Sequence, residues 1–216
     1  NRALLEQRIG ARFGVPVSVE LNTRAYTLFE HKFRREFDFE DFLFVSIRGG
    51  VGSGIIINGS LYSGPFDLAG ALGHVAVEPD GIRCRCGKRG CLETIVNDTV
   101  LRQRYASVLD VPITDVSVAD LMAAADNGES KPRRIIDTAT HYLGRTIAHT
   151  LLVLNLAHTV VSADLGERYE YFSTQLSDQI RRDILPWQDH DLHVLNLDPN
   201  GFTLGAALLF FNRSTL

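Results

Sequence analysis

All three cysteines of the chain lie in one short stretch, residues 73–93, which reads GHVAVEPDGIRCRCGKRGCLE. Cys84, Cys86 and Cys91 follow a single histidine in this stretch, His74. Three sulfur ligands and one imidazole make a complete tetrahedral set for Zn²⁺. An odd number of cysteines, two of them separated by one residue, argues against a disulfide framework. The stretch therefore predicts a closed, structural zinc site.

The alternative interpretation of these residues is a group of buried thiols, or one disulfide and a spare cysteine. Three glycines, Gly81, Gly87 and Gly90, give the backbone the freedom to fold around an ion. The alternating run 74–78 predicts a strand, and the residues from Cys91 onward predict the start of a helix. The ion would then join a strand end, a loop and a helix start.

The same stretch resembles the signature of the ROK family (repressors, open reading frames, sugar kinases), in which a Gly-His pair precedes Cys-x-Cys-Gly-x-x-Gly-Cys-x-Glu. Upstream, GSGIIINGSLYSG resembles the glycine-rich hairpin of that family, and LNTRAYTLFEHKF resembles the segment that carries its catalytic aspartate. The later runs IAHTLLVLNLAHTVVSADL and GAALLF resemble its closing helices and strand. The resemblance covers nearly the whole chain and leans toward the NagC/Mlc-like repressor branch.

This resemblance implies an α/β fold of the ribonuclease-H-like (actin/hexokinase/ROK) type, a mixed sheet covered by helices with a structural zinc loop at 74–91. It also implies that residues 1–33 are a remnant of the first lobe and that residues 34–216 form the second lobe. A repressor of this family would carry an N-terminal winged helix-turn-helix, which is absent from this chain.

Apolar spacing along the chain favours the same α/β class, because segments with strand and helix periodicity alternate. An Asn-Gly pair between two apolar runs predicts a tight hairpin turn at Asn58 and Gly59. Asn22 or Thr23 is expected to cap the second helix. The expected strands are 15–21, 42–48, 55–57, 60–62, 159–163 and 192–197, and the expected helices are 2–13, 24–33, 99–108, 118–125, 132–156, 169–184 and 202–211.

The resemblance to sugar kinases fails at the positions that carry their chemistry. The catalytic aspartate of the family corresponds to Asn22, a neutral amide that cannot accept a proton, and losing a general base costs about 10²–10⁴-fold in rate. The threonine of the phosphate turn corresponds to Gly49, and a sugar-binding glutamate corresponds to Ala71. A glycine pair near the adenine is replaced by Ala163 and Asp164. We therefore expect no catalytic residue and no kinase activity.

The remaining residues of the family's sugar site are Asn22, His74 and Glu93. His74 could bind zinc through one ring nitrogen and a sugar hydroxyl through the other. Glu93 could accept a hydroxyl, although an acid at a helix N-terminus is the simpler interpretation of that residue. These three residues are the expected contacts of a sugar or sugar-phosphate effector.

The favoured hypothesis is therefore a ligand-sensing and dimerisation domain of a transcriptional regulator. Its expected partners are further copies of the chain, as a homodimer or higher oligomer, and operator DNA through the missing N-terminal domain. An active ATP-dependent hexose kinase is one alternative. Another is a protein-interaction module that has lost sugar binding and responds to a regulatory protein, because Leu21 and Ala71 are apolar.

Composition adds exclusions to these hypotheses. With 216 residues and a net charge of −4, the chain carries no Lys/Arg block that would form a nucleic-acid surface of its own. No apolar run reaches the length that spans a membrane, and no signal peptide is present, so no membrane partner is expected. Free or metal-bound cysteines suit a reducing compartment, and we expect a cytoplasmic protein.

Overall fold

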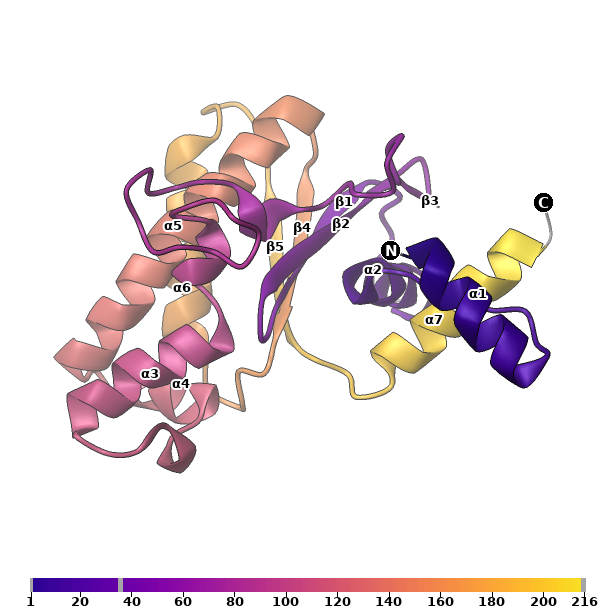
Figure 1. Cartoon of the computed structure of the whole chain (residues 1–216). Helices are drawn as coiled ribbons and strands as arrows, with labels where there is room; N and C mark the ends of the chain where they lie inside the picture. The colour runs from indigo at the N-terminus through magenta and orange to yellow at the C-terminus, as the bar shows by residue number, and fades with distance from the viewer. Residues whose placement is uncertain (1, 35–36, 215–216) are drawn as a thin grey trace. The chain divides into compact units, whose positions relative to one another are not determined.

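The computed structural model describes residues 2–34 and 37–214 (Figure 1). By its internal contacts the chain divides into two compact units, one of residues 39–197 and one that combines residues 1–38 with 198–216. The lobe boundaries expected from the sequence, 1–33 and 34–216, stay a prediction. Among the described helices, none combines the length and the apolar character that crossing a membrane requires.

The larger unit is built on a five-stranded mixed sheet in the order β3-β2-β1-β4-β5. β1 runs antiparallel to β2 and parallel to β4, and β4 runs parallel to β5. Asn58 and Gly59 have φ of 51° and 66°, the positive values that the expected hairpin turn requires. The strands are β1 Phe42–Ile47, β2 Val51–Ile57, β3 Ser60–Leu61, β4 His158–Ala163 and β5 Asp191–Asn196.

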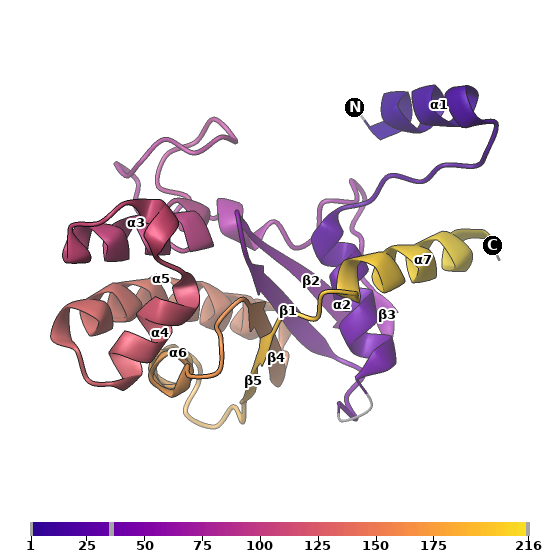
Figure 2. The same ribbon diagram turned by 90° about the horizontal axis from the view of Figure 1, so that it is seen from below.

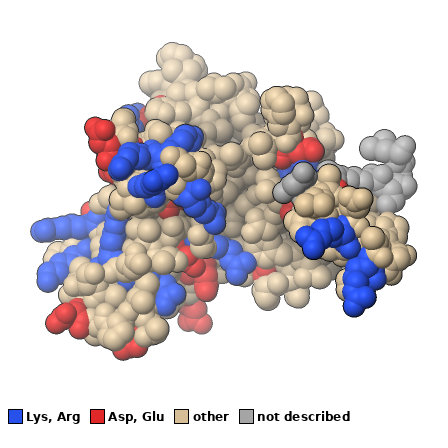
Figure 3. All heavy atoms as spheres, viewed as in Figure 1, with Lys and Arg blue, Asp and Glu red and all other residues tan. Residues whose placement is uncertain are grey.

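Four helices pack together on one face of this sheet (Figures 1 and 2). Their apolar faces meet β1 in a single core, to which Val45, Leu143 and Leu176 belong. Helices α5 and α6 approach closely at Gly144, where an added methyl group would lie 2.8 Å from the Cβ of Gln179. Charged side chains of both signs cover the outward surface of these helices (Figure 3). The helices are α3 Asp98–Leu109, α4 Val118–Asp126, α5 Ser130–Leu154 and α6 Glu170–Asp183.

The smaller unit contains three helices, and its core forms between the last two. The ring of Tyr26 meets the ring of Phe202 edge-on, with centroids 4.7 Å apart. Gly205 lets the helix backbones touch, because a methyl group there would lie 1.9 Å from the carbonyl oxygen of Ala25. The helices are α1 Arg2–Phe13, α2 Asn22–Phe33 and α7 Gly201–Ser214.

The strand predicted at 15–21 is wrong. This segment forms no strand, and side chains of α1 occupy both backbone hydrogen-bonding groups of its residue Val19. The Arg2 guanidinium donates to the Val19 carbonyl at 2.7 Å, and the Val19 N–H donates to the Glu6 carboxylate at 2.7 Å.

The expected cap of the second helix is also wrong in position. Helix α2 already begins at Asn22, and its N-cap residue is Leu21, which makes no side-chain capping bond. The amide oxygen of Asn22 accepts a hydrogen bond of 2.8 Å from the backbone of Thr23. The Asn22 side chain is exposed and lies in the first turn of the helix.

A reciprocal cap at the start of α4 provides a test of the helical layer. Ser117 Oγ accepts the Asp120 N–H at 3.1 Å, and the Asp120 carboxylate accepts the Ser117 N–H at 2.8 Å. Replacing Ser117→Ala should lower the free energy of unfolding by about 1 kcal/mol in urea titrations at pH 7.

The control is Ser107→Ala on the exposed face of α3, where the hydroxyl donates to the Gln103 carbonyl within the helix. This variant should stay within about 0.5 kcal/mol of the parent. The Ser117 hydroxyl and backbone N–H lower the pKa of Asp120, so the Ser117→Ala loss should shrink as the pH falls below about 3.9. Equal losses in both variants would contradict the assigned cap.

Candidate metal centre

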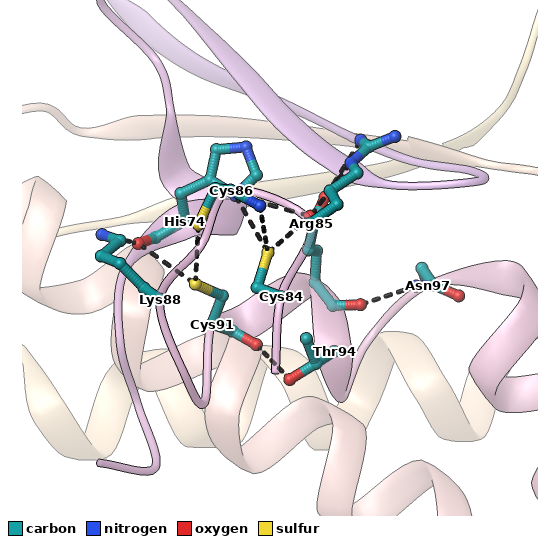
Figure 4. Close-up of polar contacts among 9 residues, drawn as sticks. His74, Cys84, Arg85, Cys86, Lys88, Cys91, Thr94 and Asn97 are labelled. Carbon is teal, nitrogen blue, oxygen red and sulfur yellow. Dashed lines mark hydrogen bonds and ion pairs between the residues drawn. The ribbon is translucent and has the colours of Figure 1, made fainter. Parts of the chain in front are cut away.

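The structure brings the four predicted zinc ligands into one cluster (Figure 4). The ligand atoms of His74, Cys84, Cys86 and Cys91 all lie within 4.8 Å of one another. The Cys84 Sγ is 3.6 Å from the His74 Nδ1, and the Cys86 Sγ is 3.5 Å from the Cys91 Sγ. Tetrahedral Zn²⁺ with Zn–S bonds of about 2.3 Å places its sulfur ligands about 3.8 Å apart. The cluster therefore has the chemistry and the spacing that a zinc ion requires.

A short hairpin presents two of the cysteines. The Cys84 N–H donates to the Lys88 carbonyl at 2.8 Å, and the Gly87 N–H returns to the Cys84 carbonyl at 3.0 Å. Gly87 and Gly90 have φ of 95° and 62°, which a glycine adopts without strain. A methyl group at Gly90 would lie 1.5 Å from the Glu78 carbonyl oxygen, so the loop closes tightly only with glycine at this position.

The other two ligands lie on short 3₁₀ turns. His74 ends η1, Leu72–His74, and Cys91 directly precedes η2, Leu92–Thr94. The strand predicted over 74–78 is wrong, because this run makes only an isolated bridge between Ala76 and Cys91. The helix predicted from Cys91 is likewise a three-residue turn, and α3 begins later.

Burial sets the protonation of the thiols. It raises the pKa of Cys84 to about 12 and raises the pKa of Cys91, because an isolated thiolate loses its hydration inside the protein. The backbone of Lys88 lowers the pKa of the exposed Cys86 by hydrogen bonding. A divalent cation would offset the cost of the two buried thiolates, because metal coordination deprotonates a thiol outright.

Glu93 lies directly against the cluster. Its Oε1 is 3.0 Å from the Cys84 Sγ and 3.5 Å from the His74 Nδ1. The Arg85 guanidinium holds both carboxylate oxygens of Glu93, with two contacts of 3.2 Å. A methyl group at Gly50 would lie 2.8 Å from Arg85 and 3.0 Å from Glu93, so this ion pair rests on the glycine turn between β1 and β2.

The structure thus unites two of the three expected effector contacts, His74 and Glu93. The third, Asn22, belongs to the smaller unit, and its part in an effector site stays a prediction. Gly49 lies in the glycine turn, where an added methyl group would meet no atom within 4 Å. Ala71 is exposed at the start of η1.

Sequence reasoning missed Arg85 and Lys88. Arg85 holds Glu93, and the Lys88 ammonium donates to the His74 carbonyl at 2.5 Å. The only signal in the sequence is that both cations fall between metal-ligating cysteines, where thiolate charge would attract them.

The two hairpin glycines give a matched test of the metal loop. Both have positive φ, but a methyl group would meet the Glu78 carbonyl at Gly90 and nothing within 4 Å at Gly87. Gly90→Ala should lose most of its bound zinc and lower the midpoint of thermal unfolding. Gly87→Ala should keep its zinc and lose about 1–2 kcal/mol of unfolding free energy, the cost of placing alanine at a positive φ. Mass spectrometry of the zinc content and a thermal melt of each variant distinguish the two outcomes. Full zinc retention in Gly90→Ala would contradict this loop geometry.

Comparisons with known proteins extend the resemblance seen in the sequence. The chain is 34% identical over 169 residues to the DNA-binding transcriptional dual regulator NagC of Escherichia coli K12, covering 76% of this chain and 42% of NagC. It is 30% identical over 217 residues to the DNA-binding transcriptional repressor Mlc of the same organism, covering 94% of this chain and 53% of Mlc. The chain therefore spans about half the length of these regulators.

A solved enzyme of the same fold is also similar. The ROK family glucokinase of Streptomyces griseus, in complex with glucose and AMPPNP, matches with a TM-score of 0.80 and 26% identity, covering 95% of this chain and 71% of the glucokinase. Residues 2–213 match the profile of the ROK family. The chain belongs to the ROK family, and its similar relatives include both transcriptional regulators and a sugar kinase.

Proposed function

We propose that this chain is the ligand-sensing and dimerisation domain of a ROK-family transcriptional regulator, and that it does not phosphorylate sugars. The observation that carries the proposal is Asn22, which stands where the family's kinases place their catalytic aspartate. Phosphorylating a sugar requires a carboxylate that accepts the proton of the attacking hydroxyl. A neutral amide cannot take that proton, and the Asn22 oxygen already accepts the Thr23 N–H.

Two further positions support the loss of catalysis. Gly49 offers no hydroxyl to a phosphate, and Ala71 offers no carboxylate to a sugar. Both positions belong to the same unit as the metal centre. The identity with NagC and Mlc, both named as DNA-binding regulators, points to the regulator branch.

In this proposal the bound zinc ion is structural. The cysteine and histidine set would leave no open coordination position for a water molecule. The ion would join η1, the hairpin and η2, and so would fix His74 and Glu93 for binding to hydroxyl groups. His74 would ligate the ion through one ring nitrogen and would keep the other for a hydrogen bond, while Glu93 is an acceptor held in place by Arg85.

A sugar or sugar phosphate bound here would act by population shift. It would favour the conformation of the dimer for which it has the higher affinity. The affinity of the dimer for operator DNA would then change, because both binding events depend on the same conformational equilibrium. DNA binding itself is assigned to the part of the regulators that lies outside the match to this chain.

One alternative has an observation of its own. Ala71 and Leu21 replace polar contacts by apolar side chains, and Leu21 is 40% exposed. A domain that has lost sugar binding would respond instead to a regulatory protein.

The decisive assay supplies the intact protein with Mg·ATP and a panel of glucose, N-acetylglucosamine and N-acetylmannosamine. We expect no sugar phosphate above background, because the neutral amide of Asn22 cannot accept the proton of the attacking hydroxyl. Sustained formation of a sugar phosphate by the parent protein would overturn the proposal.

Isothermal titration with the same sugars and their 6-phosphates should detect binding to at least one of them. Glu93→Gln should weaken that binding at least tenfold, because the neutral amide is a poorer acceptor for hydroxyl groups. Ser107→Ala, on the far surface of α3, is the matched control and should bind like the parent. Absence of binding to every ligand, with operator binding intact, would favour the interaction module.

A further inference from the structure

Two arginines face each other across the metal hairpin. Arg83 and Arg89 are partners in an antiparallel bridge. One hydrogen bond joins the two arms of the hairpin on each side of this pair. In each bond, the N–H of the residue after one arginine donates to the carbonyl of the residue before the other, at 2.8 and 2.9 Å. This pattern defines a non-hydrogen-bonded pair, in which the Cα atoms are about 4.5 Å apart and the side chains lie close together on one face.

Like charges directly opposite each other destabilise a hairpin. Both arginines are exposed, and in the described part of the chain neither lies within ion-pair distance of a carboxylate. Arg89 makes one long hydrogen bond, 3.4 Å, to the Gly81 carbonyl. The pair therefore lowers the stability of the hairpin, and no ion pair among the described residues offsets this loss.

The other cations of the hairpin do have partners. Arg85 holds Glu93, and Lys88 donates to the His74 carbonyl beside the thiols. Residues 81–92 contain four cations and no carboxylate. Lysine and arginine side chains gather over this loop in the space-filling view (Figure 3). A zinc ion with three thiolates and one imidazole carries a net charge of about −1, which leaves the loop positively charged.

We propose that Arg83 and Arg89 form a docking point for an acidic segment of a partner protein. Two adjacent guanidinium groups offer planar forks that match carboxylates in bidentate geometry. The hairpin is short and tied to the metal cluster, so little backbone freedom is lost when the partner binds. This inference requires the metal loop and is independent of any sugar effector.

A protein fits this surface better than a nucleic acid does. Binding to duplex DNA of useful affinity rests on about 6–10 phosphate contacts, which two arginines on one short hairpin cannot supply. The chain carries a net charge of −4, so a long polyanion would meet repulsion beyond the hairpin. A short acidic segment needs only the local charge.

The test uses the intact zinc-loaded protein and a fluorescein-labelled hexaglutamate peptide, read by fluorescence anisotropy at low and moderate salt. The double variant Arg83→Gln/Arg89→Gln should weaken binding at least tenfold and flatten the salt dependence. The control, Lys131→Gln/Arg134→Gln, removes two exposed charges from α5 and should change binding less than twofold. Zinc content measured on each variant verifies that the loop is intact.

Removing the metal with a chelator should weaken peptide binding as much as the double variant does, because the hairpin presents the pair. Equal loss of affinity in both double variants would overturn the proposal, as would absence of peptide binding by the parent protein. An equal loss of binding to a non-operator DNA duplex in Arg83→Gln/Arg89→Gln would reassign the pair to nucleic acid and would also overturn it.

Discussion

Four potential metal-ligand atoms, from His74, Cys84, Cys86 and Cys91, converge within 4.8 Å of one another in a loop that is otherwise poorly supported. The loop from His74 to Cys91 has little regular structure: it makes two isolated bridges, and a short 3₁₀ turn flanks it at each end. Its two buried thiols would be costly as free anions, since burial raises the pKa of both Cys84 and Cys91. A bound cation would remove that cost and would take the place of the apolar core that so short a loop cannot build.

The metal loop is also pressed against the sheet. A methyl group at Gly73 would lie 2.0 Å from the Val51 carbonyl oxygen, so η1 lies directly on the start of β2. On the other side, Glu93 and Arg85 rest on the glycine turn at Gly50. The metal cluster, strand β2 and the glycine turn between β1 and β2 therefore pack against one another as one unit. The chain is similar both to a DNA-binding regulator and to a sugar kinase of the ROK family.

Local chemistry predicted most of the helices and strands and the clustering of the four candidate metal ligands. The Cys and His spacing identified the cluster, the Asn58-Gly59 pair identified the hairpin, and apolar periodicity identified α3 to α7 within a few residues. The strand predictions at 15–21 and 74–78 failed, because apolar periodicity does not report whether a partner strand is available. In the first segment side chains of α1 bind the backbone of Val19, and the second makes a single bridge at Ala76. The pairing of Arg83 with Arg89 depends on the hairpin register, and that register is set only in three dimensions.

We infer that a zinc ion, held by three sulfurs and one nitrogen, clamps this ROK scaffold. X-ray absorption at the zinc edge of the purified intact protein tests it most directly. We predict a first shell of three sulfur atoms at about 2.3 Å and one nitrogen at about 2.0–2.1 Å. A shell of oxygen and nitrogen alone, or a preparation that folds and binds no zinc, would contradict it.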